Sequence, residues 1–401
     1  MDSVPKIIES GTVTSAQGFV AGAVSAGIKK QNTLDLAILH SEVLCSAAAV
    51  FTTNAIKSAP VLLNQQHLQN RKAQAVVVNS GYANAGTANK GIADAKSMAE
   101  SVAKKLDISP QNVLVASTGV IGIPLPMDKI HKGIEEIVLS DQGGHALAKA
   151  MMTTDTFAKE IAIHVQTEPK GFTIGGVAKG AGMIHPNMAT MLCFLTTDAT
   201  IDTEFLQMAL KKAVDDSFNM ITVDGDTSPS DTVVILANGL GGTSILNRKN
   251  GELFQKALNE VCLNLAKSIV KDGEGATKLI EVVVEGAISE TEARSAARTI
   301  ASSPLVKTAI HGNDPNWGRI VCALGRSGAK VVEDKLDSYI GRICVMKQGN
   351  PVPFNKEIAT TVLKKQEVLL HLNLNLGQGK ATAWGCDLSS EYVNINSAYT
   401  T

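Results

Sequence analysis

Aromatic residues make up only 4% of this 401-residue chain, and neither sign of charge predominates. Lysine and arginine total 37 against 38 acidic residues, which gives a formal net charge of -1. Proteins that bind nucleic acids or anionic membranes usually present a basic surface, and single-strand binders add aromatic rings on which bases stack. The composition therefore argues against both kinds of partner. A hydrophobic content of 44% is ample for a sizeable core.

Membrane, secretion and zinc signals are also absent from the sequence. No apolar run reaches membrane-spanning length, and residues 1–6 lack the apolar stretch of a secretory signal, so we expect a cytoplasmic protein. The cysteines form no CxxC pair and have no histidine cluster beside them, which argues against a zinc site. We expect reduced core thiols at all six positions: Cys45, Cys193, Cys262, Cys322, Cys344 and Cys386.

The sequence contains neither a G-x-G-x-x-G fingerprint nor a P-loop, so a nucleotide-binding fold is not expected. Short apolar strands alternate with amphipathic helices, which predicts an α/β protein of two lobes or one large layered domain. Strands are predicted at residues 19–22, 36–39, 48–51, 75–79, 113–116 and 279–284, with a hairpin at 161–165 and 172–176. Helices are predicted at residues 92–106, 145–152 and 254–269, and another opens at 201–204, with Phe205, Met208, Ala209 and Ala213 as its buried face.

The stretch from Lys179 to Leu195 changes character abruptly at its middle. Its first half is rich in glycine and other small residues, whereas its second half is apolar and predicts a buried strand. At the junction, the Thr190 hydroxyl can attack the carbonyl of Ala189, and hydrolysis of the resulting ester leaves Thr190 as a new N-terminus. Such a threonine carries its own base, because a free α-amine has a pKa near ~8. The alternative interpretation is a glycine-rich turn that enters a core strand.

Three other features of the sequence have a possible chemical use. Thr118 and Gly119 end a predicted strand and can present donors to an anion, or they form a simple turn. Lys179 and Glu274 suit a substrate carboxylate and a substrate amine, or they are solvated charges. The acidic turn at residues 224–232 lacks the final acidic ligand of a calcium loop, so it is weak support for a metal site.

The run from Lys179 to Leu192 resembles the processing-site signature of the ornithine acetyltransferase family, the glutamate N-acetyltransferases of arginine biosynthesis. The resemblance extends from about Phe19 to Thr401. It implies a layered α-β-β-α fold with two packed sheets and helices outside them, self-cleaved into two chains that stay associated. Residues 1–189 would form the α chain and residues 190–401 the β chain, assembled as a heterotetramer of two α and two β chains.

The same resemblance implies an activity and a set of site residues. The acetyl group of N-acetylornithine would pass to glutamate through an acetyl-Thr190 intermediate, without a metal or a cofactor. Thr118 and Gly119 would form the oxyanion hole. The substrate-binding residues would be Thr153 (with Thr154 as the other candidate), Lys179, Thr190, Glu274, Asn396 and Thr401.

Three questions stay open at this point. Some members of the family also use acetyl-CoA as a donor, and no nucleotide motif here decides the matter; we favour a bifunctional enzyme. Related self-processing aminopeptidases share the N-terminal nucleophile and a similar fold, but would hydrolyse peptides instead. A non-enzymatic small-molecule binding protein would keep the loops and never cleave. Product analysis separates the two enzymes, and a denaturing gel separates both from the binding protein.

Overall fold

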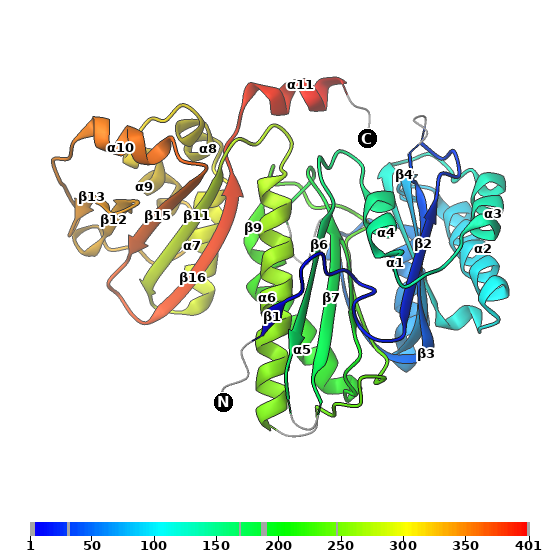
Figure 1. The fold of residues 1–401 in the computed structure, drawn as a ribbon. Helices are drawn as coiled ribbons and strands as arrows, with labels where there is room; N and C mark the ends of the chain where they lie inside the picture. The colour runs from blue at the N-terminus through cyan, green and yellow to red at the C-terminus, as the bar shows by residue number, and fades with distance from the viewer. Residues whose placement is uncertain (1–4, 30–32, 168–169, 186–190, 246–247, 399–401) are drawn as a thin grey trace.

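A computed structural model of the chain describes residues 5–29, 33–167, 170–185, 191–245 and 248–398 (Figure 1). Its first sheet has the strand order β1-β6-β7-β8-β10-β3-β4-β5, with β2 added to β3. The strands of this sheet are β1 (Lys6–Ile7), β2 (Phe19–Val24), β3 (Leu36–Phe51), β4 (Lys72–Tyr82), β5 (Val113–Val120), β6 (Lys159–Val165), β7 (Phe172–Lys179), β8 (Leu192–Thr197) and β10 (Thr232–Ala237).

The second sheet has the order β14-β13-β12-β15-β11-β16-β9. Its strands are β9 (Ile221–Thr222), β11 (Leu279–Ala287), β12 (Asp337–Ile340), β13 (Ile343–Lys347), β14 (Asn350–Pro351), β15 (Glu367–Asn373) and β16 (Gly379–Cys386). The helices are α1 (Ala59–His67), α2 (Ala88–Leu106), α3 (Met127–Glu136), α4 (Gly144–Met151), α5 (Thr203–Asp216), α6 (Arg248–Lys271), α7 (Glu290–Ala301), α8 (Pro304–His311), α9 (Trp317–Gly325), α10 (Lys356–Leu363) and α11 (Ser390–Ala398).

The predicted α/β fold with two packed sheets is confirmed. Among the described residues, one cluster of buried hydrophobic side chains contains residues of both sheets, such as Ile174 of β7 and Val282 of β11. Helix α6 contacts β6 and β7 of the first sheet and β9 and β16 of the second, so this helix lies between the sheets rather than outside them (Figure 1). None of the described helices is long and apolar enough to cross a membrane.

Strand β8 follows the proposed cleavage position and is buried along its whole length. It pairs in parallel with β10 and antiparallel with β7, so it has a hydrogen-bonded strand partner along each edge. A strand covered on both faces is expected to be a continuous apolar run rather than an alternating one. The predicted strand after Thr190 is therefore confirmed, and it fixes the chain immediately downstream of that residue.

Two of the predicted strands, at residues 36–39 and 48–51, are one 16-residue strand, β3. The sequence suggested a break because polar residues occupy the middle of this strand. The structure shows that the strand changes partners there: Leu36 to Ser41 pair with β2, whereas Ser46 to Phe51 pair with β10. The pairing with β4 shifts register between His40 and Cys45.

Helix α5 starts as predicted, because the Asp202 carboxylate accepts the backbone N–H groups of Glu204 and Phe205. Met208, however, was predicted to be buried and is 64% exposed, since the core face of α5 follows Leu206 and Leu210 instead. The expectation of six core thiols is also wrong at two positions. Cys322 is exposed and Cys344 is half-buried, whereas the other four are buried.

Candidate active site

A cavity of about 140 Å³ collects the predicted site residues from segments far apart in the sequence. It is lined by residues of β5 and β7, by the loops that follow α4 and α6, by the turn before β10, and by α11. The predicted residues on its wall are Thr118, Gly119, Thr153, Thr154, Lys179, Glu274 and Asn396. Helix α11 reaches the cavity by crossing the top of the molecule from the second sheet (Figure 1).

The proposed nucleophile and two other predicted residues, Ala189, Thr190 and Thr401, lie outside the described residues. The residue after the nucleophile, Met191, is only 3% exposed and lines the cavity. Its carbonyl accepts the backbone N–H of Thr232 at 3.0 Å, which joins it to the start of β10. The backbone on the downstream side of Thr190 is thus anchored at the cavity wall.

Gly119 lies where β5 pairs in parallel with β4, directly opposite Gly81. Its φ is +126°, and a Cβ atom at this position would overlap the backbone of Gly81. Glycine is therefore required here for both conformational and steric reasons. This packing holds the Thr118-Gly119 segment of β5 in one position on the cavity wall.

Lys179, the last residue of β7, is almost completely buried. Its ammonium donates a hydrogen bond to Thr153 Oγ1 at 2.9 Å and lies 4.0 Å from Asp155 Oδ2. The lysine thus contacts Thr153 by a hydrogen bond, while Thr154 lines the same cavity. Burial lowers the pKa of Lys179, and the Asp155 charge opposes that shift.

Asp155 is the carboxylate that sequence reasoning passed over. Burial by itself raises the pKa of Asp155, but the Lys179 and Lys159 charges outweigh it and hold the value at about 2. Its two oxygens also accept the backbone N–H groups of Thr153, at 3.0 Å, and Gly180, at 2.7 Å. The only sequence signal was its place among three threonines, at residues 153–156.

Glu274 is held in place by both its backbone and its side chain. Its N–H donates to the carbonyl of Ala181 at 2.8 Å, and its carboxylate accepts Asn396 Nδ2 at 2.8 Å. The Ser389 hydroxyl donates to Gly275 O at 2.6 Å, which ties the segment leading into α11 to the same turn. The carboxylate, the 180–182 segment and the C-terminal helix therefore meet at one point.

The acidic turn before β10 supports the loop that leads to the cleavage position. The Asp224 carboxylate accepts the N–H groups of Met183, at 2.6 Å, and Ile184, at 2.9 Å. Burial raises the pKa of Asp224, while these backbone hydrogen bonds act in the opposite direction. Burial also raises the pKa of Tyr392, with further contributions from the charges of Asp224 and Glu274. Sequence reasoning assigned no role to either Asp224 or Tyr392.

The fold and this cavity define an α/β enzyme with a small, polar active site. The pattern of the ArgJ family matches residues 20–401. The chain belongs to the ArgJ family, and the membership expected from the sequence, that of the ornithine acetyltransferases, is confirmed.

Named relatives resemble the chain over its full length. The "Arginine biosynthesis bifunctional protein ArgJ" of Dehalococcoides mccartyi is 54% identical, with all of both chains covered. The protein of that name from Caldanaerobacter subterraneus is 50% identical over 98% of this chain and 100% of its own. A crystal structure of the Bacillus halodurans protein is 49% identical, with a TM-score of 0.50, and covers 51% of this chain and 98% of its own.

Proposed function

We propose that this enzyme transfers an acetyl group from N-acetylornithine to glutamate in arginine biosynthesis, through an acetyl ester on Thr190. The observation that carries the proposal is the gathering of the described candidate residues on one cavity, beside Met191, the residue that follows Thr190. The names of the full-length relatives, which are bifunctional proteins of arginine biosynthesis, support the same pathway.

The nucleophile is released by self-cleavage between Ala189 and Thr190. The coverage of the Bacillus halodurans structure supports a two-chain product, since a chain matched over 98% of its own length spans only 51% of this one. The products, residues 1–189 and 190–401, stay associated because the cut falls between two paired strands. Strand β7 belongs to one product and β8 to the other, and they remain hydrogen-bonded along six residue pairs.

Acetyl transfer then proceeds in two balanced steps. The Thr190 hydroxyl attacks the acetyl carbonyl of N-acetylornithine while its own α-amine takes the proton, and that proton leaves with the ornithine nitrogen. The amine of glutamate next attacks the acetyl-Thr190 ester, which forms N-acetylglutamate and restores the free threonine. In both steps the Thr118 hydroxyl and the Gly119 N–H stabilise the oxyanion.

One pocket holds the two amino acids in turn. N-acetylornithine and glutamate share an α-carboxylate and an α-nitrogen, and the cavity offers the buried ammonium of Lys179 and the carboxylate of Glu274. Thr153 holds the lysine through their hydrogen bond, while Asn396 and Thr401 of the C-terminal tail complete the substrate contacts. Acetyl-CoA serves as a second acetyl donor, and the enzyme works in the cytoplasm as two α and two β chains.

The proposal is tested by mass spectrometry and product analysis on the purified protein. Wild-type protein should appear as two chains, the second beginning at Thr190, and should convert N-acetylornithine and glutamate to ornithine and N-acetylglutamate. Thr190→Ala should remain one inactive chain, whereas Thr361→Ala, an exposed threonine on α10, should behave as wild type. Release of free acetate without N-acetylglutamate would identify a hydrolase instead, and cleavage of Thr190→Ala at the same bond would exclude self-processing.

A further inference from the structure

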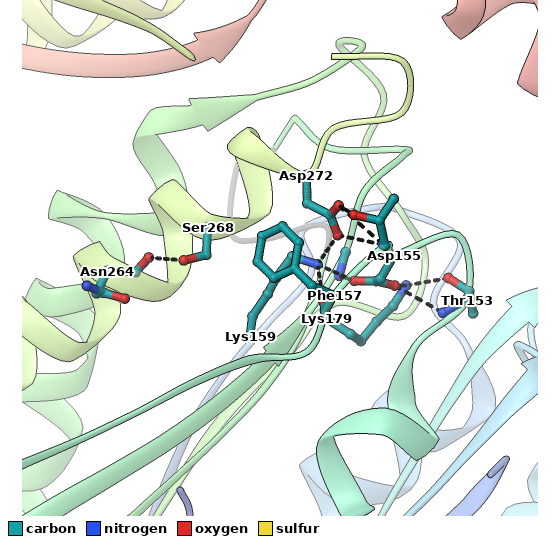
Figure 2. Close-up of polar contacts among 10 residues, drawn as sticks. Thr153, Asp155, Phe157, Lys159, Lys179, Asn264, Ser268 and Asp272 are labelled. Carbon is teal, nitrogen blue, oxygen red and sulfur yellow. Dashed lines mark hydrogen bonds and ion pairs between the residues drawn. The ribbon is translucent and has the colours of Figure 1, made fainter. Parts of the chain in front are cut away.

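Four alternating charges form a continuous buried network beside the cavity: Lys179, Asp155, Lys159 and Asp272 (Figure 2). The Lys159 ammonium lies between two carboxylates, 2.6 Å from Asp155 Oδ1 and 2.5 Å from Asp272 Oδ2. The side chains of Asp155 and Lys159 are fully buried, and that of Asp272 is 2% exposed. A set of two cations and two anions is balanced, so burial leaves no net charge without a partner.

The network connects the two halves of the chain that the proposed cleavage separates. Asp155 and Lys159 precede Thr190, whereas Asp272 follows α6, well beyond it. Asp272 also accepts the backbone N–H of Thr156, at 3.0 Å from its Oδ2 atom, and the hydroxyl of the same residue. The C-terminal end of α6 is thereby fixed against the loop that carries Thr153 and Asp155.

Each end of the network lies next to a group proposed to bind substrate. At one end, Asp155 faces the Lys179 ammonium and accepts the N–H of Gly180. At the other end, Asp272 lies two residues before Glu274, whose own N–H donates to the carbonyl of Ala181. The segments 179–182 and 272–274 are therefore joined twice, by the buried charges and by a backbone hydrogen bond.

We propose that Asp155, Lys159 and Asp272 are positioning residues that set the distance between Lys179 and Glu274 across the cleavage site. In the proposed function these two groups hold the α-carboxylate and the α-nitrogen, which all α-amino acids share. The network therefore selects for the amino-acid backbone and leaves the side chain of the substrate to other contacts. The inference rests on the proposed function, which assigns Lys179 and Glu274 to the substrate.

The network also controls the charge on Lys179. The charged groups that face this ammonium are Asp155, Lys159, Glu274, Asp231 and Lys29. Burial lowers the pKa of Lys179, Asp155 opposes this shift, and Lys159 adds to it. Removing the Asp155 charge leaves two buried ammonium groups without their shared carboxylate, so Lys179 should lose its proton at a lower pH.

The test measures the affinity of the protein for glutamate and for ornithine by calorimetry, which requires neither cleavage nor acetyl transfer. Asp272→Asn should weaken both affinities about tenfold, because the segment that carries Glu274 loses its charged contact with Lys159. Asp337→Asn is the matched control. The Asp337 carboxylate also accepts hydrogen bonds from a lysine ammonium and a backbone N–H, but this residue lies on β12, outside the cavity lining. This control should bind both amino acids as wild type does.

A charge-balanced double variant separates an effect on the distance between Lys179 and Glu274 from an effect on the stability of the protein. Lys159→Gln combined with Asp272→Asn removes one cation and one anion, so the melting temperature should recover relative to Asp272→Asn alone. The affinities should nevertheless stay about tenfold weaker. Wild-type affinity in the double variant, or failure of the double variant to fold while Asp337→Asn folds, would overturn the proposal and leave the network a purely structural role.

A second measurement follows the pH dependence of glutamate binding. Asp155→Asn should lose affinity for glutamate at a lower pH than wild type does, because Lys179 loses its proton at a lower pH. If this variant and the wild type lost glutamate binding at the same alkaline pH, that result would also contradict the proposal. Wild-type protein that binds both amino acids but transfers no acetyl group would refute the proposed function alone, so the two failures are distinguishable.

Discussion

The backbone of Gly182 lies directly against the carboxylate of Glu274, so closely that a Cβ atom on residue 182 would overlap the carboxyl group. A side chain at residue 182 is limited by space alone, and the obstacle is the end of the flexible Glu274 side chain, which can move. This contact joins the loop upstream of the cleavage position to the turn after α6. It places Glu274 on the cavity wall together with Lys179.

Gly182→Ala should move the Glu274 carboxylate while leaving the fold intact. Displacing one charged contact should raise the KM for the amino-acid substrates about tenfold, with little change in melting temperature. Steady-state kinetics and a thermal scan check both expectations. Gly325→Ala, at the end of α9 with open space around its Cβ position, is the control and should leave KM unchanged. A wild-type KM in Gly182→Ala would show that the position of Glu274 does not matter.

Thr118→Ala should lower kcat with little effect on KM. An oxyanion donor acts only as charge develops in the transition state, and loss of one such donor typically reduces the rate about 100-fold. Thr118→Ser, which keeps the hydroxyl, should retain most of the activity. A raised KM with unchanged kcat in the alanine variant would assign Thr118 to substrate binding instead.

The buried Asp155 carboxylate should make stability depend on pH in the acid range. Its pKa in the folded protein is about 2, below its ordinary value of 3.8, so its contribution is complete above pH 4 and is lost as the pH falls towards 2. The size of this contribution is about 2 kcal/mol.

The measurement is best made in the Thr190→Ala background, where one uncut chain unfolds. Adding Asp155→Asn should lower the melting temperature at pH 5 and flatten its decline between pH 4 and pH 2. An equally steep decline in both proteins would show that other carboxylates account for acid unfolding.

Acetyl-CoA and glutamate, incubated with the enzyme in the absence of N-acetylornithine, should yield N-acetylglutamate. The reason is that an acetyl-accepting threonine at the cavity wall need not recognise the whole donor, only its acetyl group. N-acetylglutamate is measured by mass spectrometry against a Thr190→Ala background. Product no higher than that background would leave one activity, the recycling of acetyl from ornithine to glutamate.

The sequence by itself determined the local elements and the family. The apolar run after Thr190 predicts β8 because a strand buried on both faces needs no polar alternation, and Asp202 predicts the start of α5 because its side chain caps backbone N–H groups. The hydrophobic pattern predicted the wrong burial for Met208, and it predicted two strands where β3 is one. In both cases distant segments decide the outcome, because they set the core face of α5 and the strand partners of β3.

Only the tertiary structure decided which side chains meet. Thr118, Lys179, Glu274 and Asn396 were each predicted separately, and the fold brings them to one cavity from four distant segments. No sequence pattern linked Asp155 and Asp272, which are 117 positions apart, because ion pairing depends on distance in space and on burial. Low local polarity strengthens the two ion pairs that Lys159 forms with these carboxylates, and that property arises only once the two sheets have packed around α6.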